Sequence, residues 1–125
     1  MRAVLCSLLV FATSANALTR SEVEEALKKA TTFFDQKVRF HGGFVWHVSS
    51  DLKYREGEGR ADDKNWVQPP GTPSVGEAFL EAYAATKDPA YLKMAEKTGE
   101  HLIGGQLESG GMDYNIEVEP TNRHT

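Results

Sequence analysis

The sequence predicts an all-α protein built from repeated helical hairpins, and three observations support this class. Apolar residues recur at helical spacing in three segments, at about 19–40, 72–86 and 89–107. Capping residues, prolines and glycines mark where these segments begin and end. Two of the helices are followed by a Gly-Gly pair and a short extended aromatic segment, HGGFVWHV at 41–48 and SGGMDYNI at 109–116. Such recurring units are typical of helical arrays in which each hairpin buries its apolar face on its neighbours.

The first helix is expected to begin at Thr19 or Ser21, because TRSE and SEVE both have the spacing of a capping box. It is expected to run to about Phe40, where Gly42-Gly43 ends it. Its apolar residues share one face at i, i+3, i+4 spacing. This face is expected to be buried, and it comprises Val23, Ala26, Leu27, Ala30, Phe33 and Phe34.

The second helix has the most strongly marked start in the chain. The prolines and glycine of residues 69–71 favour a turn, after which Thr72 is expected to cap a helix whose first residue is Pro73. Its inner face is expected to comprise Val75, Ala78, Phe79, Ala82 and Tyr83. Pro89 ends this helix and begins the third one, for which Asp88 is the expected N-cap.

The least regular part of the chain is residues 49–71, where charges of both signs alternate with glycines and no apolar period is present. A loop of this length in a compact domain is usually functional or disordered. Trp46 and Trp66 flank it, and large aromatic side chains favour an ordered loop that packs onto the rest of the protein.

The N-terminal segment has the pattern of a secretory signal peptide. A basic start is followed by a short apolar run and by Ala15-Asn16-Ala17, so cleavage after Ala17 and a secreted or periplasmic location are expected. The sole cysteine, Cys6, would leave with this segment. The net charge of −4 gives no support for nucleic-acid binding, and no later segment is apolar enough to predict a membrane span. Residues 18–125 are expected to form the N-terminal part of a longer domain.

The motifs resemble those of a known family. They are the run from Gly42 through WVQPPGTPSVG at 66–76 to GGMDY at 110–114, and the helix pair AFLEAYAATKDPAYLKMAEKTGEHLIGGQLESGG at 78–111. Together they are similar to the N-terminal part of secreted bacterial pectic acid lyase (pectate lyase) proteins, over about residues 20–117. The resemblance implies an incomplete (α/α) toroid and β-elimination of acidic polysaccharide. The family's Asp-Asn pair is replaced by QPPGTPS at 68–74, and its catalytic arginine has no counterpart, so catalytic residues remain unknown.

The expected chemistry suggests which side chains would form a site. Elimination from a uronate chain needs positive charge, often calcium, on the carboxylate, a base, and aromatic platforms for the sugar rings. The candidate substrate-binding residues supply cations, rings and an acid near a helix end: Trp46, Arg55, Arg60, Trp66, Asp113 and Tyr114. Asp62 and Asp63 are the candidate ligands for calcium.

Structural roles for the same residues are the alternatives. The charged loop is also typical of a solvated surface with internal ion pairs, the aromatic residues of packing between hairpins, and Asp113 of a turn.

Two other functions also fit the sequence. One is a non-catalytic helical-repeat module that binds carbohydrate or protein. The other is a different six-hairpin toroid enzyme, either a glycosidase or a terpene-cyclase-like protein.

Overall fold

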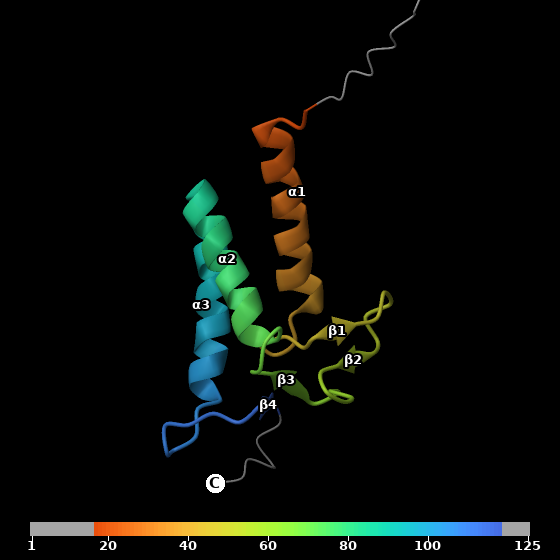
Figure 1. The fold of residues 1–125 in the computed structure, drawn as a ribbon, viewed down its shortest axis with the longest axis vertical. Coiled ribbons are helices and arrows are strands. Elements are labelled where there is room, and N and C mark those ends of the chain that lie inside the picture. The colour runs from red at the N-terminus through yellow and green to blue at the C-terminus, as the bar shows by residue number, and fades with distance from the viewer. Residues whose placement is uncertain (1–16, 119–125) are drawn as a thin grey trace, which may run out of the picture.

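The computed structural model describes residues 17–118, and its fold is mixed α/β. The described residues form three α-helices and two small antiparallel sheets. Figure 1 shows the helices side by side and the sheets gathered at one end of them. The helices are α1 (Arg20–Phe33), its π-helical continuation η1 (Phe34–Val38), α2 (Thr72–Thr86) and α3 (Pro89–Gly104). The strands are β1 (His47–Val48), β2 (Arg55–Glu56), β3 (Lys64–Trp66) and β4 (Asn115–Glu117).

Two expectations concern export and membranes. The predicted signal peptide lies, apart from its last residue Ala17, outside the described residues. Between residues 17 and 118 no helix combines the length and the apolar character needed to cross a membrane.

The prediction of an all-α, incomplete (α/α) toroid is wrong, because segments expected to be short extended turns pair as strands. In one sheet His47 of β1 lies opposite Glu56 of β2, and in the other Asn65 of β3 lies opposite Ile116 of β4. Both β2 and β3 come from residues 49–71, where the sequence showed no period. An extended segment leaves backbone N–H and C=O groups unpaired, and a second extended segment satisfies them. A helical-hairpin array made only of helices and turns does not describe this chain.

Local capping signals position two of the helices as the sequence predicts. The Thr19 side chain accepts a hydrogen bond from the Glu22 N–H at 3.3 Å, and the Glu22 carboxylate accepts one from the Thr19 N–H at 2.8 Å. The capping box at Thr19 is therefore confirmed. Asp88 caps α3 by accepting a hydrogen bond from the Ala90 N–H at 2.9 Å, and Pro89 is the first residue of that helix.

The start of α2 differs from the prediction, because Thr72 lies inside the helix and Gly71 is its N-cap without a side-chain hydrogen bond. The fully buried Thr72 hydroxyl accepts a hydrogen bond from the Phe44 N–H at 2.9 Å and donates one to the Phe44 carbonyl at 3.1 Å. This pair of bonds fixes the extended segment before β1 against the beginning of α2. Phe44 is thereby held in the core, where it packs with Phe79 and Ala95.

A second small core lies in the region of the two sheets, and it is formed by Val45, Ala61 and Trp66.

The helices α2 and α3 form a hairpin, and they pack closely against each other at Gly76 of α2. A Cβ atom at this position would lie 3.0 Å from Cγ2 of the buried Thr98 on α3. The α2–α3 hairpin is therefore the tightly packed part of the molecule.

Arg39, just after η1, joins α1 to this hairpin. Its guanidinium donates hydrogen bonds to the Asp35 carboxylate at 2.8 Å, the Met94 carbonyl at 2.9 Å and the Thr98 hydroxyl at 3.0 Å. It also lies 4.8 Å from the centre of the Phe44 ring. Because the Arg39 side chain is almost completely buried, these contacts hold a charge that would be costly to bury alone.

The apolar face of α1 departs most from the prediction. None of the residues of α1 is buried, and the side chains of Val23 and Phe33 are 51% and 48% exposed. Phe34, at the start of η1, approaches the core, where its ring centre lies 6.3 Å from that of Phe44. The helix is thus anchored at its C-terminal end, and its predicted buried face lies largely in solvent.

Candidate functional site

Arg55, a candidate for binding a substrate carboxylate, is instead a structural cation of the sheet region. The side chain is only 8% exposed and donates hydrogen bonds to the Ala61 carbonyl at 2.8 Å, the Lys64 carbonyl at 3.2 Å and the Asn65 amide oxygen at 2.7 Å. Its guanidinium carbon lies 4.1 Å from the centre of the Phe40 ring. Desolvation by burial lowers the pKa of Arg55, and the nearby Asp62 charge acts in the opposite direction. The charge is used within the protein.

Asn65 connects Arg55 to the end of α3. Its side-chain amide nitrogen donates a hydrogen bond to the Phe40 carbonyl at 2.7 Å and lies 3.2 Å from Nε2 of His101. The His101 ring in turn lies against Gly43, where a Cβ atom would be only 2.7 Å from it. The first Gly-Gly pair is required here because a ring from α3 packs directly on the backbone, a reason that the sequence alone did not reveal.

The two tryptophans pack against each other. The Trp46 and Trp66 ring centres are 5.8 Å apart in an edge-to-face arrangement, and Trp66 is 6% exposed. The Trp46 indole N–H donates a hydrogen bond to the Gln68 carbonyl at 2.9 Å. These contacts place Trp66 in the core and leave only part of Trp46 at the surface.

Tyr114 and Asp113 precede β4 and are both exposed, Tyr114 to 70%. The Tyr114 carbonyl accepts a hydrogen bond from the Val67 N–H at 2.7 Å. The structure therefore brings the backbone of Tyr114 close to the segment that Trp46 also contacts. Of the candidate aromatic residues, only Tyr114 offers most of its ring to solvent.

The charged residues of the β2–β3 connection form exposed local pairs. Arg60 Nε lies 2.6 Å from an oxygen of Asp62, and this hydrogen bond raises the pKa of Arg60. The Arg60 guanidinium also lies 5.2 Å from the centre of the Tyr54 ring. Asp63 lies 4.0 Å from the Lys64 ammonium group. In the part of the chain that the structure describes, no three His, Cys, Asp or Glu side chains form a group that could hold a metal ion.

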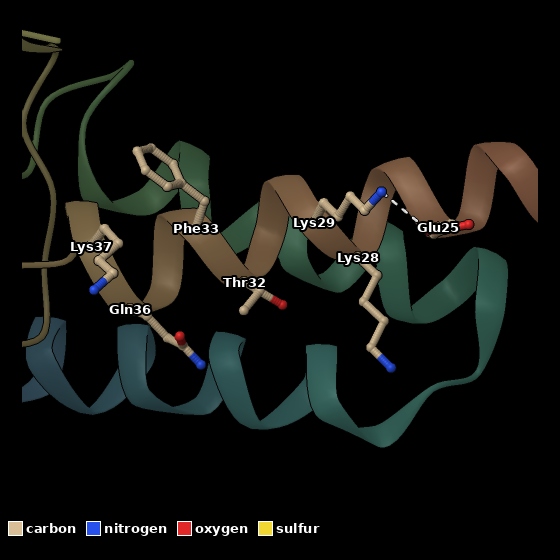
Figure 2. Close-up of a pocket in the computed structure, with 7 residues that line it drawn as sticks. All are labelled: Glu25, Lys28, Lys29, Thr32, Phe33, Gln36 and Lys37. Carbon is tan, nitrogen blue, oxygen red and sulfur yellow. Dashed lines mark ion pairs between the residues drawn. The ribbon is translucent and has the colours of Figure 1, made fainter.

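A shallow groove lies along α1 and η1, and we consider it as a surface for ligand binding. It has a volume of about 510 Å³, and Figure 2 shows the side chains around it. We call it the α1 groove, and it is lined by Glu25, Lys28, Lys29, Thr32, Phe33, Gln36 and Lys37. Three lysines and one glutamate give it a positive balance within a chain of net charge −4.

Phe33 is the aromatic side chain of the α1 groove, and lysines lie one helical turn before and after it. Lys29 pairs with Glu25 at 3.1 Å, as the dashed line in Figure 2 marks. Within residues 17–118 neither the Lys28 nor the Lys37 ammonium group has an ion-pair partner. Figure 2 shows Lys28 on the opposite side of the helix from Phe33, so the cations beside the half-exposed ring are Lys29 and Lys37.

Sequence reasoning missed this groove because it assigned Phe33 to a buried face. The available signal was the pair Lys29 and Lys37, which lie four residues before and after Phe33 on the same helix face. If neighbouring elements had covered Phe33, the same lysines would have been only solvent-exposed residues at the edge of the buried face.

The comparisons with known proteins do not identify the chain: no protein-family model matches it, and no curated protein or solved structure matches it.

Proposed function

We propose that this protein is exported and binds acidic polysaccharide, and that a uronate chain docks in the α1 groove. The observation that carries the proposal is the half-exposed Phe33 ring between lysines of the same helix face. The ring offers an apolar platform for the C–H face of a sugar, and the lysines offer charge-assisted hydrogen bonds to its carboxylates.

The spacing of the charges favours a polymer over a single sugar acid. Lys29 and Lys37 are separated by about two helical turns, or roughly 11 Å along the axis. A monosaccharide carries one carboxylate and can satisfy only one of these cations. A chain with a carboxylate on every unit can engage both ends of the groove while a ring between them rests on Phe33.

Binding is the activity that the described residues support best. Elimination would require a base beside the reacting carbon, in addition to cations and sugar platforms. Of the two arginines that the sequence offered for binding substrate carboxylates, Arg55 is occupied by the protein's own carbonyl and amide groups, and Arg60 pairs with Asp62. The α1 groove supplies the charge and the ring that binding alone needs.

The test is calorimetric titration with polygalacturonate, its oligomers and monomeric galacturonate at low and high salt. We expect the oligomers to bind, the monomer to bind far more weakly, and affinity to fall as salt screens the exposed lysines. Absence of any binding by the unmodified protein would overturn the proposal. Absorbance in the near ultraviolet, followed on the same samples with calcium, reports unsaturated products if the protein also performs β-elimination.

Matched variants localise the binding. Changing both Lys29 and Lys37 to Gln should weaken oligomer binding by about 3- to 10-fold, since each is an exposed charge contact. The control changes Lys53 and Lys93 to Gln, because both are exposed, lie outside the groove and alter the net charge equally. Phe33→Leu should also weaken binding while keeping an apolar side chain. Equal effects of the two lysine pairs would contradict a specific role for the groove.

A further inference from the structure

A second exposed surface of α1 lies beside the groove. Val23, Ala26, Ala30 and Phe33 are all exposed and follow one another at spacings of three, four and three residues. We call them the α1 stripe. This spacing is that of the a and d positions of a heptad, which in paired helices face a partner helix. Figure 1 shows α1 on the outside of the α2–α3 hairpin, so another helix has access to it.

The low stability expected for α1 by itself indicates that another molecule covers the α1 stripe. A helix of its 14 residues is marginal in water by itself, and helices in proteins owe most of their stability to packing of an apolar face. Here the anchoring contacts are concentrated at the C-terminal end, through Phe34 and Arg39. The N-terminal part is held by its capping box, by exposed ion pairs and by one long hydrogen bond of 3.4 Å from Arg20 to the Ala85 carbonyl, and such exposed contacts contribute little.

We infer that the α1 stripe pairs with the α1 stripe of a second copy of this chain, in antiparallel orientation. The charge distribution along the helix favours this partner. The charges next to the stripe have opposite signs at its two ends: Glu22 precedes Val23, and Lys37 follows Phe33 by four residues. Antiparallel pairing sets the end with Glu22 against the end with Lys37 of the second copy, whereas parallel pairing sets like charges against each other. It also opposes the two helix dipoles.

An antiparallel pair of identical helices has two-fold symmetry, and the α1 stripes of the two copies are complementary in shape under this symmetry. In an antiparallel pair each a position faces a d position, so Val23 lies opposite Phe33 of the second copy and Ala26 lies opposite its Ala30. Small residues then meet at the centre, where the helices approach most closely, and large residues meet at both ends. Phe33 belongs to both the α1 stripe and the α1 groove, so a paired α1 and a docked uronate chain would compete for its ring. Ala26 and Ala30 do not line the groove, and variants at these two positions therefore test the pairing separately from the proposed function.

Sedimentation velocity tests the association directly. The mass of the unmodified protein should rise toward that of two chains between about 5 μM and about 500 μM. Ala30→Glu, which places a charge near the two-fold axis, should keep the protein monomeric throughout. Ala84→Glu, at an exposed alanine of α2, is the matched control and should associate like the unmodified protein. A mass that stays at one chain in the unmodified protein, or equal behaviour of the two variants, would overturn the inference.

Cysteine trapping tests the orientation. In a Cys6→Ser background, a mixture of the Ala26→Cys and Ala30→Cys proteins should form more disulfide-linked dimer than either protein alone. These two positions face each other only in the antiparallel pair, and a disulfide requires closely apposed Cα atoms. Stronger cross-linking of each variant with itself would instead show parallel or unspecific contact, and would contradict the proposed arrangement.

Discussion

The α2–α3 hairpin and α1 are both amphipathic helical segments, yet they differ sharply in how far they are buried. Phe79 of α2 is 2% exposed, whereas Phe33 of α1 is 48% exposed. The hairpin helices approach each other closely at Gly76, whereas α1 has no buried residue and is fixed mainly at its C-terminal end. This difference shows that an apolar stripe in a sequence predicts a surface that another group will cover. The stripe does not show whether the same chain, a second copy of the chain or a ligand provides the cover.

The largest expected effect comes from a matched pair of side-chain truncations, one in the hairpin and one in α1. Phe79→Ala removes a ring from the packed core and should lower the free energy of unfolding by about 3–5 kcal/mol. Phe33→Ala removes a half-exposed ring and should cost less than about 1 kcal/mol in the monomer. Urea denaturation at low protein concentration measures both values. Similar losses for the two variants would show that α1 is packed as tightly as the hairpin.

Arg39 should be the second most sensitive position, because it is the junction of the two regions. Arg39→Ala removes bonds to Asp35, Met94 and Thr98 and should cost about 3 kcal/mol, as expected for the loss of one partner in a buried ion pair. Lys29→Ala, at an exposed residue of α1 that pairs with Glu25 of the same helix, is the control and should change stability little. Hydrogen exchange should show faster opening of α1 in the Arg39 variant, and unchanged exchange there would contradict its role as an anchor.

The smallest expected effect concerns the N-terminal end of α1. Hydrogen bonds from the Thr19 backbone N–H and side chain lower the pKa of Glu22. Since this pKa is lower in the folded than in the unfolded chain, ionised Glu22 stabilises α1 at neutral pH, and this contribution is lost as the pH falls through the folded-state value. The unmodified protein should be slightly more stable than Glu22→Gln at about pH 7, and the two should converge near about pH 2.5.

That experiment compares denaturation midpoints of the two proteins at each pH. A difference that stayed constant between the two conditions would mean that the charge of Glu22 does not contribute. Glu24→Gln is a suitable control, because its carboxylate pairs with Arg20 and lies outside the capping box.

The candidate site was only partly accessible to sequence reasoning. Trp46, Trp66 and Tyr114 were chosen as possible sugar platforms, and the structure does place them around one backbone segment. The structure also buries Trp66 and Arg55. The sequence could not predict this for Arg55, because it does not show whether an arginine faces solvent or donates to three acceptors inside the protein. The α1 groove was missed since its ring was expected inside the protein.

The sequence by itself determined the features that depend on neighbours within one helical turn. These include the capping box at Thr19, the cap at Asp88 and the start of α3 at Pro89, because all atoms that form each cap lie within a few residues. Only the tertiary structure decided which extended segments pair, as Asn65 does with Ile116, and which helix face is covered. Those outcomes depend on contacts between residues far apart in the chain, where one apolar or extended pattern is compatible with several partners.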